Sequence, residues 1–173
     1  KQSKKGLEEK QMQKVEVMMR DYHNLKKQLN ILAYEIEHFK GIDEADLIES
    51  MCFSHPQGER VTSSTLSDKT AKVAIALDTR KEKIDDEIYE FYLKEYQELK
   101  DRIDFFELAL FQLSGELTAI MQDLVVKKYS WDEIADKYHM SRTMVGRYRK
   151  KAIAELSSIY ELRKQKQIKF MLS

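Results

Sequence analysis

The sequence predicts an all-α protein, in which a long N-terminal helical hairpin or coiled coil precedes a small C-terminal domain of short helices. Charged residues make up 35% of the 173 residues, whereas glycine occurs five times and proline once. This composition lacks the turn residues that a many-stranded sheet needs and is typical of amphipathic helices. Apolar residues with heptad spacing near the N-terminus support the same fold class.

The first long helix is expected to span Val15 to Phe39. Its apolar residues are separated alternately by three and four positions, as are the a and d positions of a heptad. These residues are Val15, Met18, Tyr22, Leu25, Leu29, Leu32, Ile36 and Phe39. Such a narrow apolar stripe must pair with another helix, either in the same chain or in a second copy. Gly41 is placed to end the helix.

A loop near residues 41–67 is expected next, because this segment holds the only proline, Pro56, with Gly58 and several serines and threonines. From Asp68 to about Leu113 there is no proline or glycine. We expect one very long helix here, or two in line with a break near 78–83, able to fold back on the first helix as an antiparallel hairpin. Residues 1–113 are therefore predicted to be an assembly region, and residues 114–173 a separate domain.

Three short helical patterns follow residue 115, at about 116–128, at 131–138 and from 142 onward. Ser130 and Glu133 have the spacing of a capping box at the start of the second pattern, and Ser141 can cap the third. Two capped helices joined by so short a turn predict a helix-turn-helix. His139 stands in the turn, where a left-handed backbone is usual and glycine is preferred. Gly146 lies inside the third helix, where glycine costs about 1 kcal/mol relative to alanine.

Apolar side chains at helical spacing are expected to form the core of this motif. They are Ile134, Ala135, Tyr138, Met140, Val145 and Tyr148, continued by Ala152, Leu156 and Ile159. Arg142, Thr143 and Arg147 are then left outside, where the first turns of a helix in the major groove meet base edges. Arginine can bridge two guanine acceptors, and threonine can contact a thymine methyl. Contacts to DNA phosphates are expected from Lys127, Lys128, Ser130, Ser141, Arg149, Lys150 and Lys151.

The stretch "SWDEIADKYHMSRTMVGRYRKKAIAEL" resembles region 4 of the sigma-70 class of bacterial sigma factors. The matching features are the Ser-Arg opening, Val145 and the run Lys150-Lys151-Ala152. Sigma proteins commonly carry an acidic residue in place of Thr143 and glutamine in place of Arg147, so their base preference does not carry over. Nothing upstream resembles sigma region 2.

The layout of the whole chain resembles the ArpU/RinA-type transcriptional activators of phages and prophages of Gram-positive bacteria. The similar features are the segment "YHNLKKQLNILAYEIE", the polar segment "PQGERVTSSTLSDKTAKVAIAL", a long charged helix and then the motif. This resemblance implies an activator of late phage genes that binds upstream DNA, with host RNA polymerase as a candidate partner.

Other classes of function have little support in the sequence. There is no Ser/His/Asp constellation, phosphate-binding glycine loop or HExxH, so we expect no enzyme. Cys52 and His55, with His38 and Glu59, are too few and too scattered to predict a metal site, and no cofactor is expected. The lone cysteine favours a reducing, cytoplasmic location, and no apolar run predicts a membrane span. Because the net charge is zero, a nucleic acid must be met by a local basic patch.

The sequence thus predicts a cytoplasmic regulator that binds double-stranded DNA as a homo-oligomer, with a dimer favoured. The basic stretch 141–151 has five cations and no anion, but a basic stretch alone is more often a solvated helix face. A phage terminase small subunit, which recognises packaging DNA, is one alternative. A coiled-coil adaptor that binds RNA polymerase is another.

Overall fold

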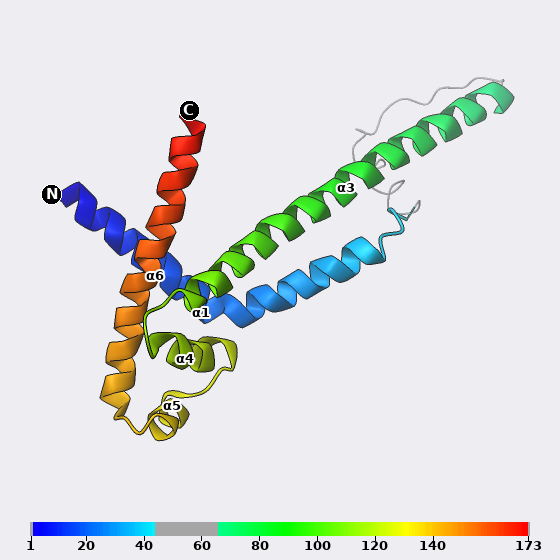
Figure 1. Cartoon of the computed structure of the whole chain (residues 1–173). Coiled ribbons are helices and arrows are strands. Elements are labelled where there is room, and N and C mark those ends of the chain that lie inside the picture. The colour runs from blue at the N-terminus through cyan, green and yellow to red at the C-terminus, as the bar shows by residue number, and fades with distance from the viewer. Residues whose placement is uncertain (1, 44–65, 173) are drawn as a thin grey trace. The chain divides into compact units, whose positions relative to one another are not determined.

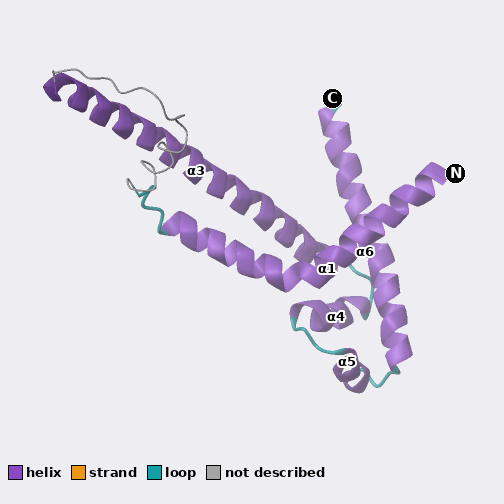
Figure 2. Cartoon of the chain, turned by 180° about the vertical axis from the view of Figure 1, so that it is seen from behind, coloured by secondary structure: helices purple, strands orange, loops and turns teal. Residues whose placement is uncertain are grey.

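The computed structural model describes residues 2–43 and 66–172, and all regular secondary structure in these two ranges is helical (Figure 1, Figure 2). This confirms the all-α prediction. Most of the loop expected at 41–67 lies outside the described residues, as do Cys52 and His55. No helix in the described ranges combines the length and the apolar character needed to cross a membrane.

Two long helices supply just over half of the described residues. Helix α1 runs Gln2–Glu37 and helix α3 runs Leu66–Phe111. Helix α3 has no break, so the alternative of two helices in line near 78–83 is wrong. Helix α1 ends before Gly41, whose φ of +81° lies in the left-handed region. Gly41 therefore shapes the chain after the helix and does not itself end it.

Four shorter or later elements complete the chain. They are α4 (Leu117–Met121), the π-helical turn η1 (Gln122–Val126), α5 (Trp131–Lys137) and α6 (Arg142–Met171). The first short pattern, expected at about 116–128, is thus divided into an α-helical and a π-helical part. In η1 the backbone N–H of Lys127 donates to the carbonyl of Gln122, five residues earlier.

The described chain divides into two compact units: unit 1 comprises residues 1–29 and 99–173, and unit 2 comprises residues 30–98. The predicted boundary at Ser114 falls inside unit 1. The reason is that the end of α3 packs with the first half of α1 and with α6. Tyr22 lies against Phe106, with ring centroids 5.7 Å apart, and Phe105 lies edge-on to Tyr160 at 4.9 Å.

The core of unit 1 draws on every helix in it. Its fully buried side chains include Val15, Ile103, Phe106, Leu110, Leu117, Ile120, Ile134, Val145 and Leu156. At one edge the Tyr22 hydroxyl donates to Glu107 at 2.6 Å, and the Lys26 ammonium donates to the same oxygen at 3.0 Å. Burial and the bond to Glu107 raise the pKa of Tyr22 well above its usual value. The predicted heptad positions Val15, Met18 and Tyr22 are buried as expected.

Unit 2 pairs the end of α1 with part of α3. Phe39, just beyond α1, packs on Tyr89 and Tyr92 with centroids 5.4 and 6.2 Å apart, and Asp85 accepts from the Ile42 N–H at 2.7 Å. Residue 39 thus meets 92 while residue 42 meets 85, so the two segments run antiparallel. None of the side chains described in unit 2 is fully buried, and its heptad positions are half-buried.

Candidate nucleic-acid interface

Helices α5 and α6 are joined by a short turn, and both begin at a serine cap. We call residues 130–151 the bihelical unit. The Ser130 hydroxyl accepts from the Glu133 N–H at 3.3 Å, while the Glu133 carboxylate accepts from the Ser130 N–H at 2.7 Å. Ser141 accepts from the Met144 N–H at 3.3 Å. The predicted capping box and second cap are therefore confirmed.

The turn between the helices has the backbone that the sequence predicts. His139 has a φ of 52°, in the left-handed region. This conformation lets the Met140 N–H donate to the Ala135 carbonyl at 2.9 Å, which closes the end of α5. Histidine adopts a positive φ more readily than most residues other than glycine, asparagine and aspartate.

A small apolar core fixes the two helices against α4 and η1. Ile120, Ile134 and Val145 are fully buried, one each from α4, α5 and α6. Partly buried hydrophobic residues surround them: Leu124, Ala135, Tyr138, Met140 and Tyr148. The predicted set of inward residues is confirmed, and Ala152 and Leu156 continue the buried face along α6.

The first three turns of α6 carry exposed cations. Arg142, Thr143, Arg147, Lys150 and Lys151 are all exposed. Arg142 lies 3.5 Å from Asp132 in an ion pair whose two side chains are both well exposed, so the contact is weak. Lys151 is close enough to Glu155 to help lower the pKa of that carboxyl, although the backbone N–H of Ser114 contributes most. The three residues predicted to read bases thus share an accessible surface.

The other residues predicted to contact phosphates differ in their exposure and in their partners within the chain. Lys127 binds Asp123 at 2.8 Å, and Arg149 binds Glu16 of α1 at 3.3 Å. The Arg149 side chain is 29% exposed and is held by Glu16 of α1, so it is less accessible than Arg142 and Arg147. Lys128 is exposed and has a φ of 62°. The hydroxyls of Ser130 and Ser141 already act as caps.

Gly146 has a neighbour that the sequence did not identify. A Cβ placed on Gly146 would lie 3.4 and 3.6 Å from two ring carbons of Trp131. These distances are ordinary van der Waals contacts, so α5 lies close to α6 here with room for a methyl group. Trp131, 37% exposed, thus covers the middle of the bihelical unit from outside.

Asp123 in η1 is the buried carboxylate of this region and was missed by sequence reasoning. It is 2% exposed and accepts hydrogen bonds from the Lys137 ammonium and from the Tyr138 hydroxyl at 2.8 Å, besides its bond to Lys127. Burial raises its pKa, but the three donors outweigh burial and hold the pKa at about 2. Burial and the bond to Asp123 together raise the pKa of Tyr138 to about 12. The cluster ties η1 to α5.

Helix α1 also contacts this region. A ring nitrogen of His23 lies 2.9 Å from the Val125 carbonyl in η1, and Glu16 binds Arg149 of α6. Both views show the first half of α1 crossing α6 (Figure 1, Figure 2). The N-terminal helix therefore supports the bihelical unit directly.

Within the described ranges, no group of three or more histidine, cysteine or acidic side chains is arranged to hold a metal ion. No protein-family model, curated protein or solved structure matches the chain.

Proposed function

We propose that this protein is a sequence-specific DNA-binding transcription regulator, in which the bihelical unit is a helix-turn-helix and the start of α6 enters the major groove. The observation that carries the proposal is the two-sidedness of α6. One face buries Val145, Ala152 and Leu156, whereas Arg142 in the first turn and Arg147 on the other side of the helix are in solvent. A rigid, capped helix with an exposed cationic start is what a recognition helix requires.

The exposed residues divide by chemistry and by position along α6. Arg142, Thr143 and Arg147 lie in its first two turns, where side chains of a recognition helix reach base edges. Either arginine can bridge the two acceptors of a guanine. Lys150 and Lys151 follow a turn later and suit phosphate oxygens, which fix the position of the protein without reading sequence. Lys128 is a further exposed cation for this role.

The resemblance of residues 130–156 to sigma region 4, and of the chain layout to ArpU/RinA-type activators, supports a regulator of late phage genes acting in the cytoplasm of a bacterial host. Host RNA polymerase is then a natural second partner. No observation favours packaging DNA over a promoter.

We further propose that the chain acts as a dimer. The side chains described in unit 2 leave Ile31, Tyr34 and Phe91 more than half exposed. Apolar side chains that are this exposed on two long helices would be stabilised by burial against a second copy. Pairing two bihelical units would also double the length of DNA recognised.

Selection of bound duplexes from a random DNA pool tests the proposal. The full chain is expected to enrich one sequence, arranged as a palindrome or a repeat if two copies bind. Binding is expected to weaken steeply as salt rises, because phosphate contacts release counterions. Failure to enrich any sequence, with no salt-sensitive binding to the unselected pool, would overturn the proposal.

A further inference from the structure

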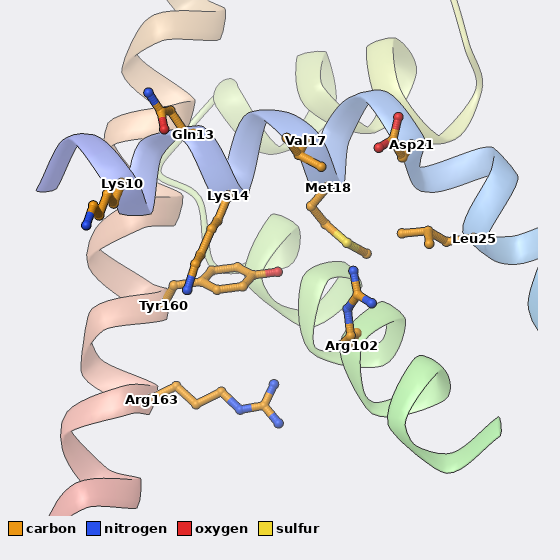
Figure 3. A pocket seen from close by; sticks show the side chains of 10 residues that line it. All are labelled: Lys10, Gln13, Lys14, Val17, Met18, Asp21, Leu25, Arg102, Tyr160 and Arg163. Atoms are coloured by element: carbon orange, nitrogen blue, oxygen red, sulfur yellow. The ribbon is translucent and has the colours of Figure 1, made fainter. Parts of the chain in front are cut away.

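A cleft in unit 1 lies between the first half of α1, the end of α3 and the later part of α6 (Figure 3). Its volume is about 640 Å³, which falls within the range of small-molecule sites between packed helices. Tyr160, which lines it, stands about 27 Å along α6 from Arg142, given the rise of an α-helix. The cleft is therefore separate from the surface proposed to bind DNA.

Apolar groups form much of the lining. Val17, Met18 and Leu25 of α1 contribute aliphatic surface, and Tyr160 of α6 contributes its ring. Val17 is 44% exposed, so an apolar side chain on this wall stays in contact with water. A ligand with an apolar body would bury this surface.

The Tyr160 wall is held in place before any ligand arrives. The ring of Phe105 meets Tyr160 edge-on, and the Arg163 guanidinium lies 4.1 Å from the centre of the Phe105 ring. Asp101 binds the same guanidinium. Burial raises the pKa of Tyr160 to about 12, although Arg163 and Arg102 act in the opposite direction. The hydroxyl therefore keeps its proton at neutral pH and can donate.

Cations surround the opening. Lys10, Lys14, Arg102 and Arg163 line the cleft. Within the described part of the chain, only Arg163 of these four has an assigned acidic partner. Asp21 is the acidic residue of the lining, and Arg20 holds its carboxylate at 2.9 Å and lowers its pKa. The net charge of the side chains at the opening that have no acidic partner is therefore positive.

We propose that this cleft binds a small organic anion, with its apolar body between α1 and the Tyr160 ring and its carboxylate or phosphate head at Arg102, Arg163 and the Tyr160 hydroxyl. Figure 3 shows these three groups directed into the same space, with the Lys14 side chain beside the ring. Charge-assisted bonds from guanidinium groups are the strongest available to such a head. A protein partner would need a surface of roughly 800 Å², whereas this cleft is confined between three helices.

Titration of the full chain with 8-anilinonaphthalene-1-sulfonate, an aromatic anion that fluoresces in apolar surroundings, tests the proposal. The wild-type chain is expected to bind one equivalent. The double variant K14Q/R102Q should bind at least about tenfold more weakly, because it loses the Arg102 guanidinium that contacts the head and a second positive charge in the lining. Both side chains are exposed, so the variant is expected to fold, and far-ultraviolet circular dichroism is the check on this. The matched control K164Q, which removes an exposed cation next to Arg163 but outside the cleft, should bind as the wild type does.

Competition identifies the head group. Decanoate or decyl phosphate should displace the probe, and the stronger competitor shows which head the cleft prefers. Decyltrimethylammonium, with the same chain and the opposite charge, should not. Equal affinity of wild type and K14Q/R102Q, absence of a one-to-one complex, or equal competition by the cationic chain would each overturn the proposal.

Discussion

At the scale of single residues, Asp123 and its three donors hold η1 against α5. A carboxylate that is only 2% exposed is stable in its ionised form because Lys127, Lys137 and Tyr138 all donate to it. Asp123 follows Ile120 by three positions, so its inward direction was readable from the sequence. Its bonds to Lys137 and Tyr138 were not, because they depend on how η1 and α5 meet.

Replacement of Asp123 by asparagine should destabilise the protein by about 2 kcal/mol, since charge-assisted hydrogen bonds are lost in a buried place. Urea unfolding followed by circular dichroism measures the change. The exposed Asp136, on α5, provides the control D136N, which should stay near wild type. Equal stability of D123N and D136N would contradict the role given to Asp123.

Lowering the pH should remove the stability that the ionised carboxylate of Asp123 contributes. The carboxyl of Asp123 has a pKa of about 2 in the folded chain and an ordinary value of 3.8 when unfolded, so the unfolded state binds the proton first as the pH falls. The stability due to its charge is therefore present above about pH 4 and lost between about pH 4 and 2. Unfolding curves over this range should show the wild-type advantage over D123N shrinking. A constant advantage down to pH 2 would mean that the charge is not responsible.

Replacement of Gly146 by alanine is expected to raise the stability of the protein. Because Trp131 leaves room for a methyl group, G146A should stabilise α6 by up to about 1 kcal/mol through helix propensity. The exposed Ala154 on the same helix gives the converse control, A154G, which should lose about as much. Thermal unfolding measures both. A loss of stability in G146A would show that Trp131 cannot accommodate the methyl group.

At the scale of elements, the two caps define the start of α5 and of α6. They were predictable from sequence because a cap depends on residues only three positions apart, as in Ser130 with Glu133. The continuity of α3 and the π-helical turn η1 were not, because both depend on packing in the folded chain. The same limit applies to Arg149, whose partner Glu16 lies on another helix.

Substitutions at Ser141 should separate capping from DNA binding. S141A removes the acceptor for the Met144 N–H and should cost about 1 kcal/mol. S141D keeps a good cap, so stability should remain near wild type, but its charge would face the phosphates and weaken binding to any duplex. Unfolding and DNA titration of both variants measure the two effects. If S141D binds DNA as tightly as wild type, the start of α6 does not lie near the backbone.

At the scale of the whole molecule, the all-α class and the layout of long and short helices followed from periodicity and from the scarcity of glycine and proline. The division into units did not, because unit 1 joins residues 1–29 to residues 99–173 across most of the chain. Heptad spacing identifies a seam but not its partner. The seam is buried at Val15 and Tyr22 and only half-buried at Leu32.

The dimer proposal predicts the molecular mass of the protein in solution. Sedimentation equilibrium of the full chain should give twice the 20.5 kDa of one copy. I31E, which places a charge among the exposed apolar side chains of unit 2, should shift the mass toward a single copy, whereas the exposed E35Q should not. A wild-type chain that sediments at 20.5 kDa at micromolar concentration would exclude the dimer.

Binding of the selected duplex and of a random duplex to R142A and K151A tests the central claim most directly. Fluorescence anisotropy should show R142A losing about 1–3 kcal/mol on the selected duplex and much less on the random one, because Arg142 would read a base. K151A should weaken binding to both duplexes about equally, because a phosphate contact carries no sequence. If both variants lose the same affinity on both duplexes, the start of α6 does not read DNA sequence, and the account is contradicted.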